Sequence, residues 1–338
     1  MSAAAPSLSV VMPVLDGRRF LERSLPPLLE GVPDTLLEVL VVDDGSRNGS
    51  GEWARQQGAR VLCTGGREGP AVARNLGARE ARGEVVLFVD ADVVIHRDAP
   101  EHLKQALRDP EVVAVFGSYD DRPPDPAFAS QYMNLRHHHV HQTAREEATT
   151  FWAGCGAVRR RDFLAVGGYD GGRFAHPSIE DIELGYRLRA RGGRIRIVPE
   201  MQGTHLKQWK LWSVIHTDVV RRALPWSRLL LERREAAGDL NASPVERARA
   251  ALAAALALSV PAAAVGWLPP LLPGLLFLLA CGANRRLFCL FRRRRGTGFA
   301  LAGLLFHQLY YLYSASVYLW CWLERAVGRR RATSGAPS

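Results

Sequence analysis

The sequence predicts an α/β domain built on a doubly wound, mostly parallel sheet, followed by an α-helical transmembrane region. From residue 7 to about residue 198, short β-branched runs alternate with segments long enough to form helices. Near-continuous apolar runs of this kind are typical of parallel strands buried on both faces of a sheet. Beyond residue 244 the chain changes to long uncharged stretches, which are typical of membrane spans. A chain of 338 residues has room for one such domain and a smaller second part.

Five apolar runs are predicted to form the strands of this sheet. They are residues 8–13, 38–42, 60–62, 84–89 and 112–116. Acidic residues follow three of these runs, namely Asp16, the pair Asp43 and Asp44, and the pair Asp90 and Asp92. Because ligands of a doubly wound sheet bind beyond the carboxyl ends of its strands, we expect the functional site at this edge.

The basic residues indicate a membrane partner and no nucleic acid. The chain has 44 lysines and arginines against 34 aspartates and glutamates, a net charge of +10. Much of this excess lies beside the uncharged stretches, at residues 285–286, 292–295 and 329–331. Basic residues in such positions are typical of segments that flank membrane spans and contact acidic lipids. We therefore expect membrane lipids as partners.

The cysteines and the first residues bear on the compartment. The five cysteines are scattered and show no Cys-x-x-Cys spacing, which indicates a reducing compartment. Residues 1–6 lack the basic region of a signal peptide. We expect no cleaved signal, and an α/β domain that stays on the cytoplasmic side of the inner (cell) membrane in a multi-pass protein.

Residues 246–327 are predicted to form two to three membrane spans. Residues 250–283 hold no charged residue, and one helix of that length would measure about 51 Å against roughly 30 Å of hydrocarbon. Because prolines interrupt this run, we expect either two closely spaced spans or a re-entrant hairpin that turns near residues 267–270. A further span is expected at residues 297–323, where tyrosines and tryptophans suggest an aromatic belt.

Two segments flank the predicted spans. Residues 206–245 mix tryptophans and cations with apolar residues, which suits either a helix in the lipid headgroup region or a linker helix packed on the α/β domain. Residues 328–338 are basic and then small and polar, and we expect a disordered tail there. The predicted α/β domain is residues 1–205.

Asp90 and Asp92 are the candidate metal ligands. Two carboxylates one residue apart at a strand end can point the same way, and burying them is costly unless a cation neutralises them. Hard oxygen ligands favour Mg²⁺ or Mn²⁺, held partly by substrate phosphates. The alternative is an ordinary surface turn, and the buried run before the pair favours the metal site.

Asp43 and Asp44 are the candidate nucleotide contacts. They follow a buried run and precede Gly45 and Ser46, so their carboxylates are expected at the rim where a base or ribose would enter. The alternative is an Asp-Gly turn in which an aspartate side chain caps the next helix.

Asp181 is the candidate general base. It opens a helix predicted at residues 181–191, next to Glu180, where its carboxylate could take a proton from an acceptor hydroxyl. Alternatively, Ser178 and Asp181 form a capping box and the acidic residues only offset the helix dipole. Glycines before this helix, among them Gly154, would let an acceptor approach the backbone closely.

The histidines provide one candidate ligand and one cluster. His205 follows a strand predicted at residues 194–198, and it supplies either a third metal ligand or the start of a helix. The cluster is His137, His138, His139 and His141. Consecutive histidines point around a helix and do not converge on one ion, so we interpret the cluster as lining of the acceptor cleft or as surface.

Six segments, in this order, resemble the family 2 glycosyltransferases with the GT-A fold. They are residues 8–14, 41–46, 69–75, 88–92, 167–170 and 180–181. Their joint occurrence, over roughly residues 8–209, is far more specific than any single one. The resemblance implies a GT-A-type sheet and a transferase that moves a sugar from a nucleotide-diphospho-sugar to a hydroxyl or phosphate acceptor, with inversion.

The resemblance implies roles for Pro13, Val14, Asp44, Arg74, Asp90, Asp92 and Asp181, and the residue patterns described above add the other site residues. The donor-binding residues would be Pro13, Val14, Asp16, Asp43, Asp44, Arg74 and Asp90. Among them, Asp44 would contact the base, Arg74 would lie near the diphosphate and Asp90 near the ribose. The metal ligands would be Asp92, Asp90 and His205. Asp181 would be the general base, and the acceptor-side residues would be Gly154, Glu180 and Trp209.

Two departures narrow the expected function. Residues 15–17 read Leu-Asp-Gly where many members have Tyr-Asn-Gly, and only Lys207-Gln208-Trp209 stands where processive synthases carry Gln-x-x-Arg-Trp. We therefore expect a single transfer to a lipid-linked or membrane-delivered acceptor of the cell envelope. The alternatives are a processive synthase, a sugar nucleotidyltransferase and a catalytically silent scaffold. Residues 13–17 lack the Gly-rich loop of a nucleotidyltransferase, and the presence of both Asp92 and Asp181 favours an enzyme.

Overall fold

The structure divides the chain into two compact units. It is a computed structural model that describes residues 6–30, 36–233 and 243–334, with side chains up to residue 327. The first unit, an α/β unit, is Met1–Gln208, and the second, a helical unit, is Trp209–Ser338.

In the described residues, the α/β unit contains nine strands of a single sheet. They are β1 (Leu8–Val14), β2 (Leu36–Asp43), β3 (Arg60–Cys63), β4 (Val85–Val89), β5 (Val93–Ile95), β6 (Val112–Tyr119), β7 (Glu147–Ala148), β8 (Cys155–Arg159) and β9 (Arg194–His205). The five runs predicted as strands form β1, β2, β3, β4 and β6. The strand predicted at residues 194–198 is the first half of β9, which continues to His205.

The sheet is mixed, with strand order β3-β2-β1-β4-β8-β6-β9-β5, and β7 pairs with β9. β1 pairs in parallel with β2 and β4, β2 with β3, and β6 with β9. β8 runs antiparallel between β4 and β6, while β5 and β7 run antiparallel to β9. Six of these described strands therefore share one direction, which confirms the predicted mostly parallel α/β sheet.

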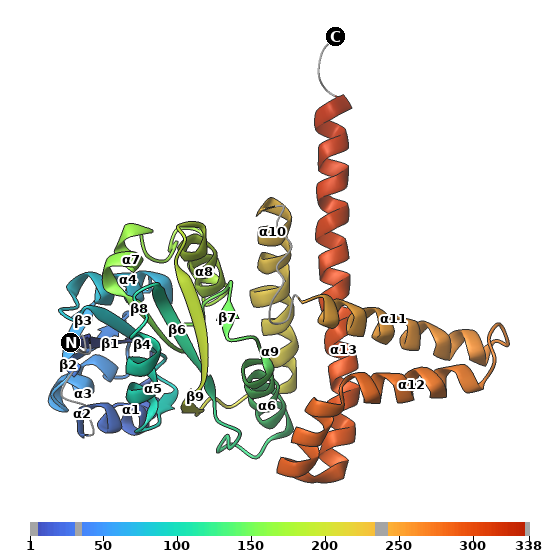
Figure 1. Cartoon of the computed structure of the whole chain (residues 1–338), viewed down its shortest axis with the longest axis horizontal. Coiled ribbons are helices and arrows are strands. Elements are labelled where there is room, and N and C mark those ends of the chain that lie inside the picture. Colours follow the sequence, from blue (N-terminus) through green and yellow to red (C-terminus); the bar gives the residue numbers. More distant parts are fainter. Residues whose placement is uncertain (1–5, 31–35, 234–242, 335–338) are drawn as a thin grey trace. The chain divides into compact units, whose positions relative to one another are not determined.

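Helices cover both faces of the sheet, as expected of a doubly wound fold. They are α1 (Arg18–Ser24), α2 (Pro26–Glu30), α3 (Ser50–Gln56), α4 (Pro70–Glu80), α5 (Ala99–Ala106), α6 (Phe128–Thr143), α7 (Arg160–Ala165) and α8 (Glu180–Ala190). Figure 1 shows α4, α7 and α8 on one side of the sheet and α1, α2, α3 and α5 on the other. The central strands are accordingly buried on both faces, and every residue of β4 and β6 is buried.

The helix α4 packs closely on the central strands because of one glycine. A Cβ atom at Gly77 would lie only 2.4 Å from Val11 Cγ1 on β1, so a larger residue would push the helix away. Arg74 lies on the same helix, three residues earlier, and is also buried. The close approach thus brings a charged side chain down to the level of the sheet.

The helical unit begins with one nearly continuous helix and ends with three more. In order they are α9 (Leu211–His216), the π-helix η1 (Thr217–Ala223), α10 (Leu224–Arg233), α11 (Pro244–Ala264), α12 (Leu271–Ala283) and α13 (Arg285–Ser334). Gly296, with φ 84°, breaks α13 into two helical parts. The tail predicted from residue 328 falls partly in α13 and partly in residues 335–338, which lie outside the described residues.

Among the described residues, one helix, Pro244–Ala264, is long and apolar enough to cross a membrane. A second candidate is α12 taken together with α13 up to Val327, although the two are bent by 76° at their junction. By length and composition, therefore, the described chain offers one span or up to two.

Candidate active site

Asp16 ties together the loops that follow β1, β2 and β3. Its backbone adopts φ 51°, a left-handed conformation that aspartate tolerates better than most residues. Its backbone N–H donates to Ser46 Oγ at 2.9 Å, and its carboxylate accepts from the Arg47 backbone N–H at 2.7 Å. The same carboxylate pairs with the Arg67 guanidinium at 2.7 Å. Asp16 thus orders the rim at the carboxyl ends of these strands.

Asp43 and Asp44 have different local roles. Asp43 Oδ1 accepts from the Ser46 backbone N–H at 2.9 Å, which forms the turn of the alternative interpretation. Neither aspartate caps the next helix, because the N-cap of α3 is Gly49 and has no side-chain cap. Asp44 is buried, and its carboxylate accepts from Thr64 Oγ1 and from the backbone N–H groups of Glu68 and Gly69, at 2.7 to 2.9 Å. Asp44 therefore holds the loop that leads into α4.

Pro13 and Val14 end β1 beside these aspartates. Val14 is buried, and its carbonyl accepts from the Asp44 backbone N–H at 2.9 Å. A Cβ atom at Gly17 would lie 2.8 Å from Val14 Cγ2. The predicted nucleotide-pocket residues from β1 and β2 therefore do lie together.

The buried Arg74 guanidinium joins Asp90 to Glu180. Arg74 Nη2 lies 2.7 Å from Asp90 Oδ1, and Nη1 lies 3.0 Å from Glu180 Oε1. The side chains of Arg74 and Glu180 are each only 6% exposed. Burial by itself lowers the pKa of Arg74, but the negative charges of Asp90 and Glu180 outweigh it and raise that pKa above its ordinary value. Arg74 thus holds the end of β4 and the start of α8 in place.

Asp92 and His205 meet at the ends of two other strands. The His205 Nε2 atom lies 3.5 Å from Asp92 Oδ2, and both side chains are largely buried. The backbone supports this contact, because β5 pairs with β9 at Val93 and His205, and the Leu206 N–H donates to the Asp92 carbonyl at 2.8 Å. Burial raises the pKa of Asp92, but the nearby His205 and Lys207 charges lower it overall.

A flat ring contact fixes the His205 imidazole. It stacks on the Tyr119 ring with 4.2 Å between centroids and 4° between planes. His205 ends β9 and does not start a helix, so that alternative is wrong.

Asp92 and His205 suit a divalent cation, whereas the full predicted ligand set does not assemble. Among the described residues no three His, Cys, Asp or Glu side chains converge on a common point, because the Asp90 carboxylate turns to Arg74. A carboxylate oxygen and an imidazole nitrogen side by side nevertheless fit Mn²⁺ or Mg²⁺, which commonly take their remaining ligands from substrate phosphates and water.

Asp181 lies partly buried in the first turn of α8. Its Oδ2 accepts from the Ala153 N–H at 3.2 Å and its Oδ1 from the Ile182 N–H at 2.8 Å. Burial, with the charge of Glu180 beside it, raises the pKa of Asp181 to about 7. The predicted capping box is absent, since the N-cap is Ile179 and makes no side-chain hydrogen bond.

Gly154 connects the Asp181 side of the site to the Asp90 side. It follows Ala153, and its carbonyl accepts from the Asp90 N–H at 3.3 Å. A Cβ atom at Gly154 would lie 2.4 Å from the Trp152 ring, so the glycine makes room for that indole. Trp209, also predicted on the acceptor side, belongs to the helical unit.

An aromatic cluster lies beside His205 and was not predicted from the sequence. It consists of Tyr119, His137, His141 and Trp152, whose ring centroids lie 4.2 to 5.0 Å apart in successive pairs. His138 and His141 donate from Nδ1 to the carbonyls of Tyr119 and Gly117, each at 2.8 Å. The histidine cluster is therefore largely packing between α6 and β6. No local pattern in the sequence signals this, because Tyr119 and Trp152 are far apart along the chain.

The contacts of Tyr169 were also not predicted from the sequence. Its ring packs on Phe88 and Phe163 and lies 5.6 Å from the Arg74 guanidinium carbon. Its hydroxyl is buried and has no hydrogen-bond partner among the described residues. The Gly-Gly-Tyr-Asp segment that contains it was the available signal.

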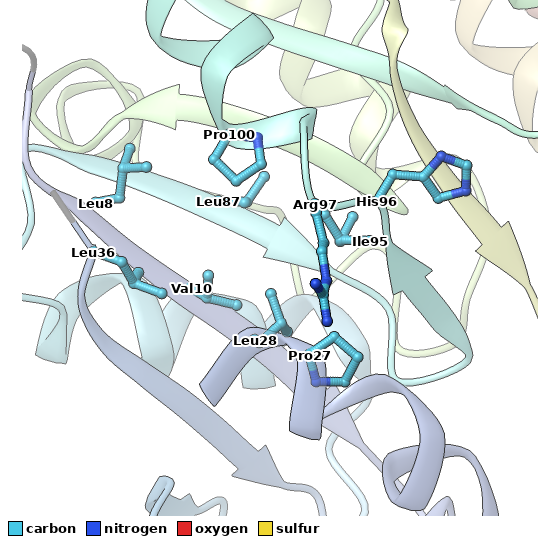
Figure 2. Close-up of a pocket in the computed structure, with 10 residues that line it drawn as sticks. All are labelled: Leu8, Val10, Pro27, Leu28, Leu36, Leu87, Ile95, His96, Arg97 and Pro100. Atoms are coloured by element: carbon cyan, nitrogen blue, oxygen red, sulfur yellow. The ribbon is translucent and has the colours of Figure 1, made fainter. Parts of the chain in front are cut away.

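The small apolar cavity of the α/β unit is not this site. Figure 2 shows it between residues such as Leu8, Val10, Leu28, Leu87 and Pro100. Its volume of about 30 Å³ leaves room for no more than a few water molecules. Leu8 lies at the amino end of β1, whereas the acidic residues follow the carboxyl ends, so the cavity is a gap in core packing.

Comparison with solved structures defines the class of fold. The mannosyltransferase PcManGT from Pyrobaculum calidifontis, solved in complex with GDP-Man and Mn²⁺, matches with a TM-score of 0.62 at 24% identity, over 94% of this chain and 88% of that one. This likeness, together with the mixed sheet, shows a GT-A-type fold.

Sequence comparison then defines the family. The family model described as glycosyl transferase family 2 matches residues 9–167. An N-acetylglucosaminyltransferase of Rhizobium leguminosarum bv. trifolii is 32% identical over 132 residues, which cover 34% of this chain and 68% of the relative. The chain belongs to glycosyl transferase family 2.

Other curated relatives are longer than the region they share with this chain. The glycosyltransferase GlyG of Streptococcus pneumoniae serotype 4 is 30% identical over 117 residues, or 33% of this chain. The chain spans less than half the length of GlyG and of two further relatives, at 38%, 47% and 45%.

Replacing Arg74 by alanine is expected to destabilise the α/β unit by about 3–5 kcal/mol, because it leaves the buried Glu180 carboxylate without its partner. Urea unfolding followed by intrinsic fluorescence measures this change. The matched control is Arg55→Ala, since Arg55 pairs with Glu52 on the surface and both are more than half exposed, which predicts a loss of about 0–1 kcal/mol. Equal effects of the two substitutions would contradict the role assigned to Arg74.

Proposed function

We propose that the chain is a membrane-associated, metal-dependent glycosyltransferase. It would transfer a sugar from a nucleotide-diphospho-sugar to a hydroxyl or phosphate acceptor by inverting displacement. The observation that carries this proposal is the pairing of Asp92 with His205 at the edge where Asp90 is linked to Asp181. That link runs through Gly154 and Ala153, whose backbone groups bond to Asp90 and Asp181. A metal-binding pair and a basic carboxylate are thereby held on neighbouring parts of one edge.

Asp92 Oδ2 and His205 Nε2 would hold Mn²⁺ or Mg²⁺. When bound, the cation neutralises charge on the departing nucleoside diphosphate. Stacking on Tyr119 keeps the imidazole in the orientation that faces Asp92, so little side-chain ordering remains when the donor arrives. Asp90 is partly exposed, with 32% of its side chain accessible, and supports a contact with the donor ribose on its open side.

The donor nucleotide would contact the rim formed by the loops after β1 and β2. Pro13 and Val14 would line the nucleotide pocket, with Asp16, Asp43 and Asp44 around it. The hydrogen bonds of Asp44 to the Glu68 and Gly69 N–H groups support a preorganised wall for the base. The buried contacts of Arg74 favour an indirect action on the diphosphate, by holding Asp90 in place.

Asp181 would accept the proton of the acceptor hydroxyl. A carboxyl group with a pKa of about 7 is a stronger base than an ordinary aspartate and is still substantially ionised near neutral pH. Glu180 is held by Arg74 and by the Ser178 N–H at 2.8 Å, so its role would be to position Asp181. Gly154 would be the acceptor-side residue next to this carboxylate, and the acceptor-side role of Trp209, in the helical unit, stays a prediction.

The acceptor would be lipid-linked or delivered at the inner membrane. The helical unit supports this, because its exposed surface carries large apolar side chains such as Leu258, Trp267 and Leu271, which favour contact with lipid. The missing Gln-x-x-Arg-Trp motif favours one transfer over polymer synthesis.

Membranes that contain the protein serve as the source of acceptor in the test of this function. Uridine, guanosine and thymidine diphosphate sugars, labelled in the sugar, are supplied with Mn²⁺, and the label transferred is measured. Asp92→Asn and Asp181→Asn should each reduce transfer at least about 100-fold, since the first removes a ligand of the cation that neutralises the departing diphosphate and the second removes the base. Asp98→Asn, at an exposed residue before α5, is the matched control. Full activity of both site variants would refute the proposal.

The pH dependence of transfer should follow the ionisation of Asp181. Because its carboxyl must be ionised to accept a proton, kcat/KM is expected to rise with pH through a midpoint near 7 and to level off above it. A flat profile between pH 6 and pH 8 would argue against Asp181 as the base.

The pKa of Asp181 is higher in the folded state than in the unfolded state, so folding favours the protonated carboxyl. The resulting contribution to stability is complete below the unfolded pKa and is lost as pH rises through about 7.

A further inference from the structure

The helices α11 and α12 form a hairpin whose outer surface is apolar. They are joined by residues 265–270, where Gly266 adopts φ 78°, and Figure 1 shows them side by side within the helical unit. Trp267 at the turn is 83% exposed and Leu271 is 85% exposed. Apolar exposure on this scale indicates that another apolar medium covers the hairpin.

The whole of α11 is long enough to cross a bilayer, but the uncharged part of the hairpin is shorter than the hydrocarbon core. The first helix of the hairpin carries Glu246, Arg247 and Arg249 in its first turns, and only residues 250–264 are free of charge. At 1.5 Å per residue these 15 residues extend about 22 Å, and the 13 residues of α12 extend about 20 Å. The hydrocarbon core is roughly 30 Å thick, so a hairpin that starts at one surface ends about 10 Å before the other.

Polar contacts mark the base of the hairpin. The Tyr311 hydroxyl lies 2.8 Å from Glu246 Oε2 and 3.1 Å from Asn284 Oδ1. These contacts join the start of α11, the end of α12 and the middle of α13. Arg249 pairs with Glu246, and Arg285 follows Asn284. The base of the hairpin therefore suits the headgroup region, where basic side chains contact lipid phosphates.

The second part of α13 exposes apolar side chains such as Leu305 and Trp320, but its end also carries polar and charged contacts. It packs along η1 and α10, where Tyr313 donates to Asp218 Oδ2 at 2.7 Å and Arg228 pairs with Glu324 at 3.2 Å. Arg228 and Glu324 are each about half exposed, at 49% and 51%. Exposed charges of this kind are costly in hydrocarbon, so this stretch of α13 suits the interface.

We infer that the helical unit is monotopic: the α11–α12 hairpin enters one leaflet of a lipid bilayer and returns to the same side, while α9, η1, α10 and the end of α13 lie at the interface. The occupant of the apolar surface is the acyl-chain region of that leaflet. This inference rests on the proposed membrane association. It also replaces the expectation of two to three spans with none.

Thiol labelling of variants with one accessible cysteine each tests whether the hairpin returns to the side from which it enters. Cys155 is wholly buried and stays, while Cys63, Cys281 and Cys321 are replaced by serine. One variant keeps the exposed Cys289 near the base; two others also carry Cys289→Ser and place the cysteine at the tip, as Trp267→Cys or Val265→Cys. Each protein is added to preformed vesicles of phosphatidylethanolamine and phosphatidylglycerol. A membrane-impermeant maleimide is then supplied either outside or trapped inside.

The expected result is that Cys289 reacts only with outside reagent and that both tip cysteines react with neither until detergent is added. Labelling of a tip cysteine from inside would mean that the hairpin crosses the bilayer, and labelling from outside would mean that it does not insert. Either result would overturn the inference. Sugar transfer is measured on the same vesicles supplied with a membrane lipid extract, so that inactive protein with a protected tip would count against the proposed function alone.

Discussion

The candidate site depends on one buried positively charged side chain, that of Arg74. Arg74 reaches Asp90 and Glu180 at once, and these residues come from the end of β4 and the start of α8. A guanidinium that is 6% exposed is stable only with such partners, because an unpaired buried charge costs several kcal/mol. The arrangement in turn requires α4 to lie close to β1, which the absence of a side chain at Gly77 permits. The packing of α4 on the sheet and the placement of the start of α8, which carries the proposed base Asp181, thus depend on the same contact.

A second constraint acts on the metal side and is largely independent of the first. The pairing of β5 with β9 sets Val93 opposite His205, which brings the preceding residue Asp92 next to the imidazole, and the Tyr119 ring stacks on that imidazole. The two constraints meet only at the short segment from Asp90 to Asp92. Because Asp90 is drawn to Arg74 and Asp92 to His205, two carboxylates one residue apart take different roles. The spacing of an Asp-x-Asp motif alone does not predict that its two carboxylates have different partners.

The strands with strong hydrophobic patterns were predictable, and those defined by pairing were not. β1, β2, β3, β4 and β6 are continuous apolar runs, which the period-two and buried-strand patterns detect. β8 begins Cys155-Gly156 and β5 has only three residues, so neither has a pattern of its own. The second half of β9 contains Pro199 and Gly203, residues that argue against a strand in a sequence pattern. Pro199 falls where the pairing of β9 with β6 shifts register, between Ile197 and Gln202.

The same distinction holds for the site and for the helical unit. Residues next to strand ends, such as Asp92, could be placed from the sequence because strand ends share one edge. The contact of Arg74 with Glu180 joins residues 106 positions apart, and no local pattern encodes it. In the helical unit hydropathy indicated lipid contact, and the inference of a hairpin in place of spans required the lengths of the helices and the polar contacts of Tyr311.

Manganese binding, followed by electron paramagnetic resonance, tests whether Asp92 and His205 hold the metal ion of the proposed enzyme. Free Mn²⁺ is titrated against the protein with and without uridine or guanosine diphosphate. The account predicts tight binding that depends on a nucleoside diphosphate, and an affinity at least about tenfold weaker in His205→Ala and in Asp92→Asn. His102→Ala, on α5 and outside the site, should bind as the unmodified protein does. Unchanged manganese affinity in His205→Ala and Asp92→Asn would contradict the account.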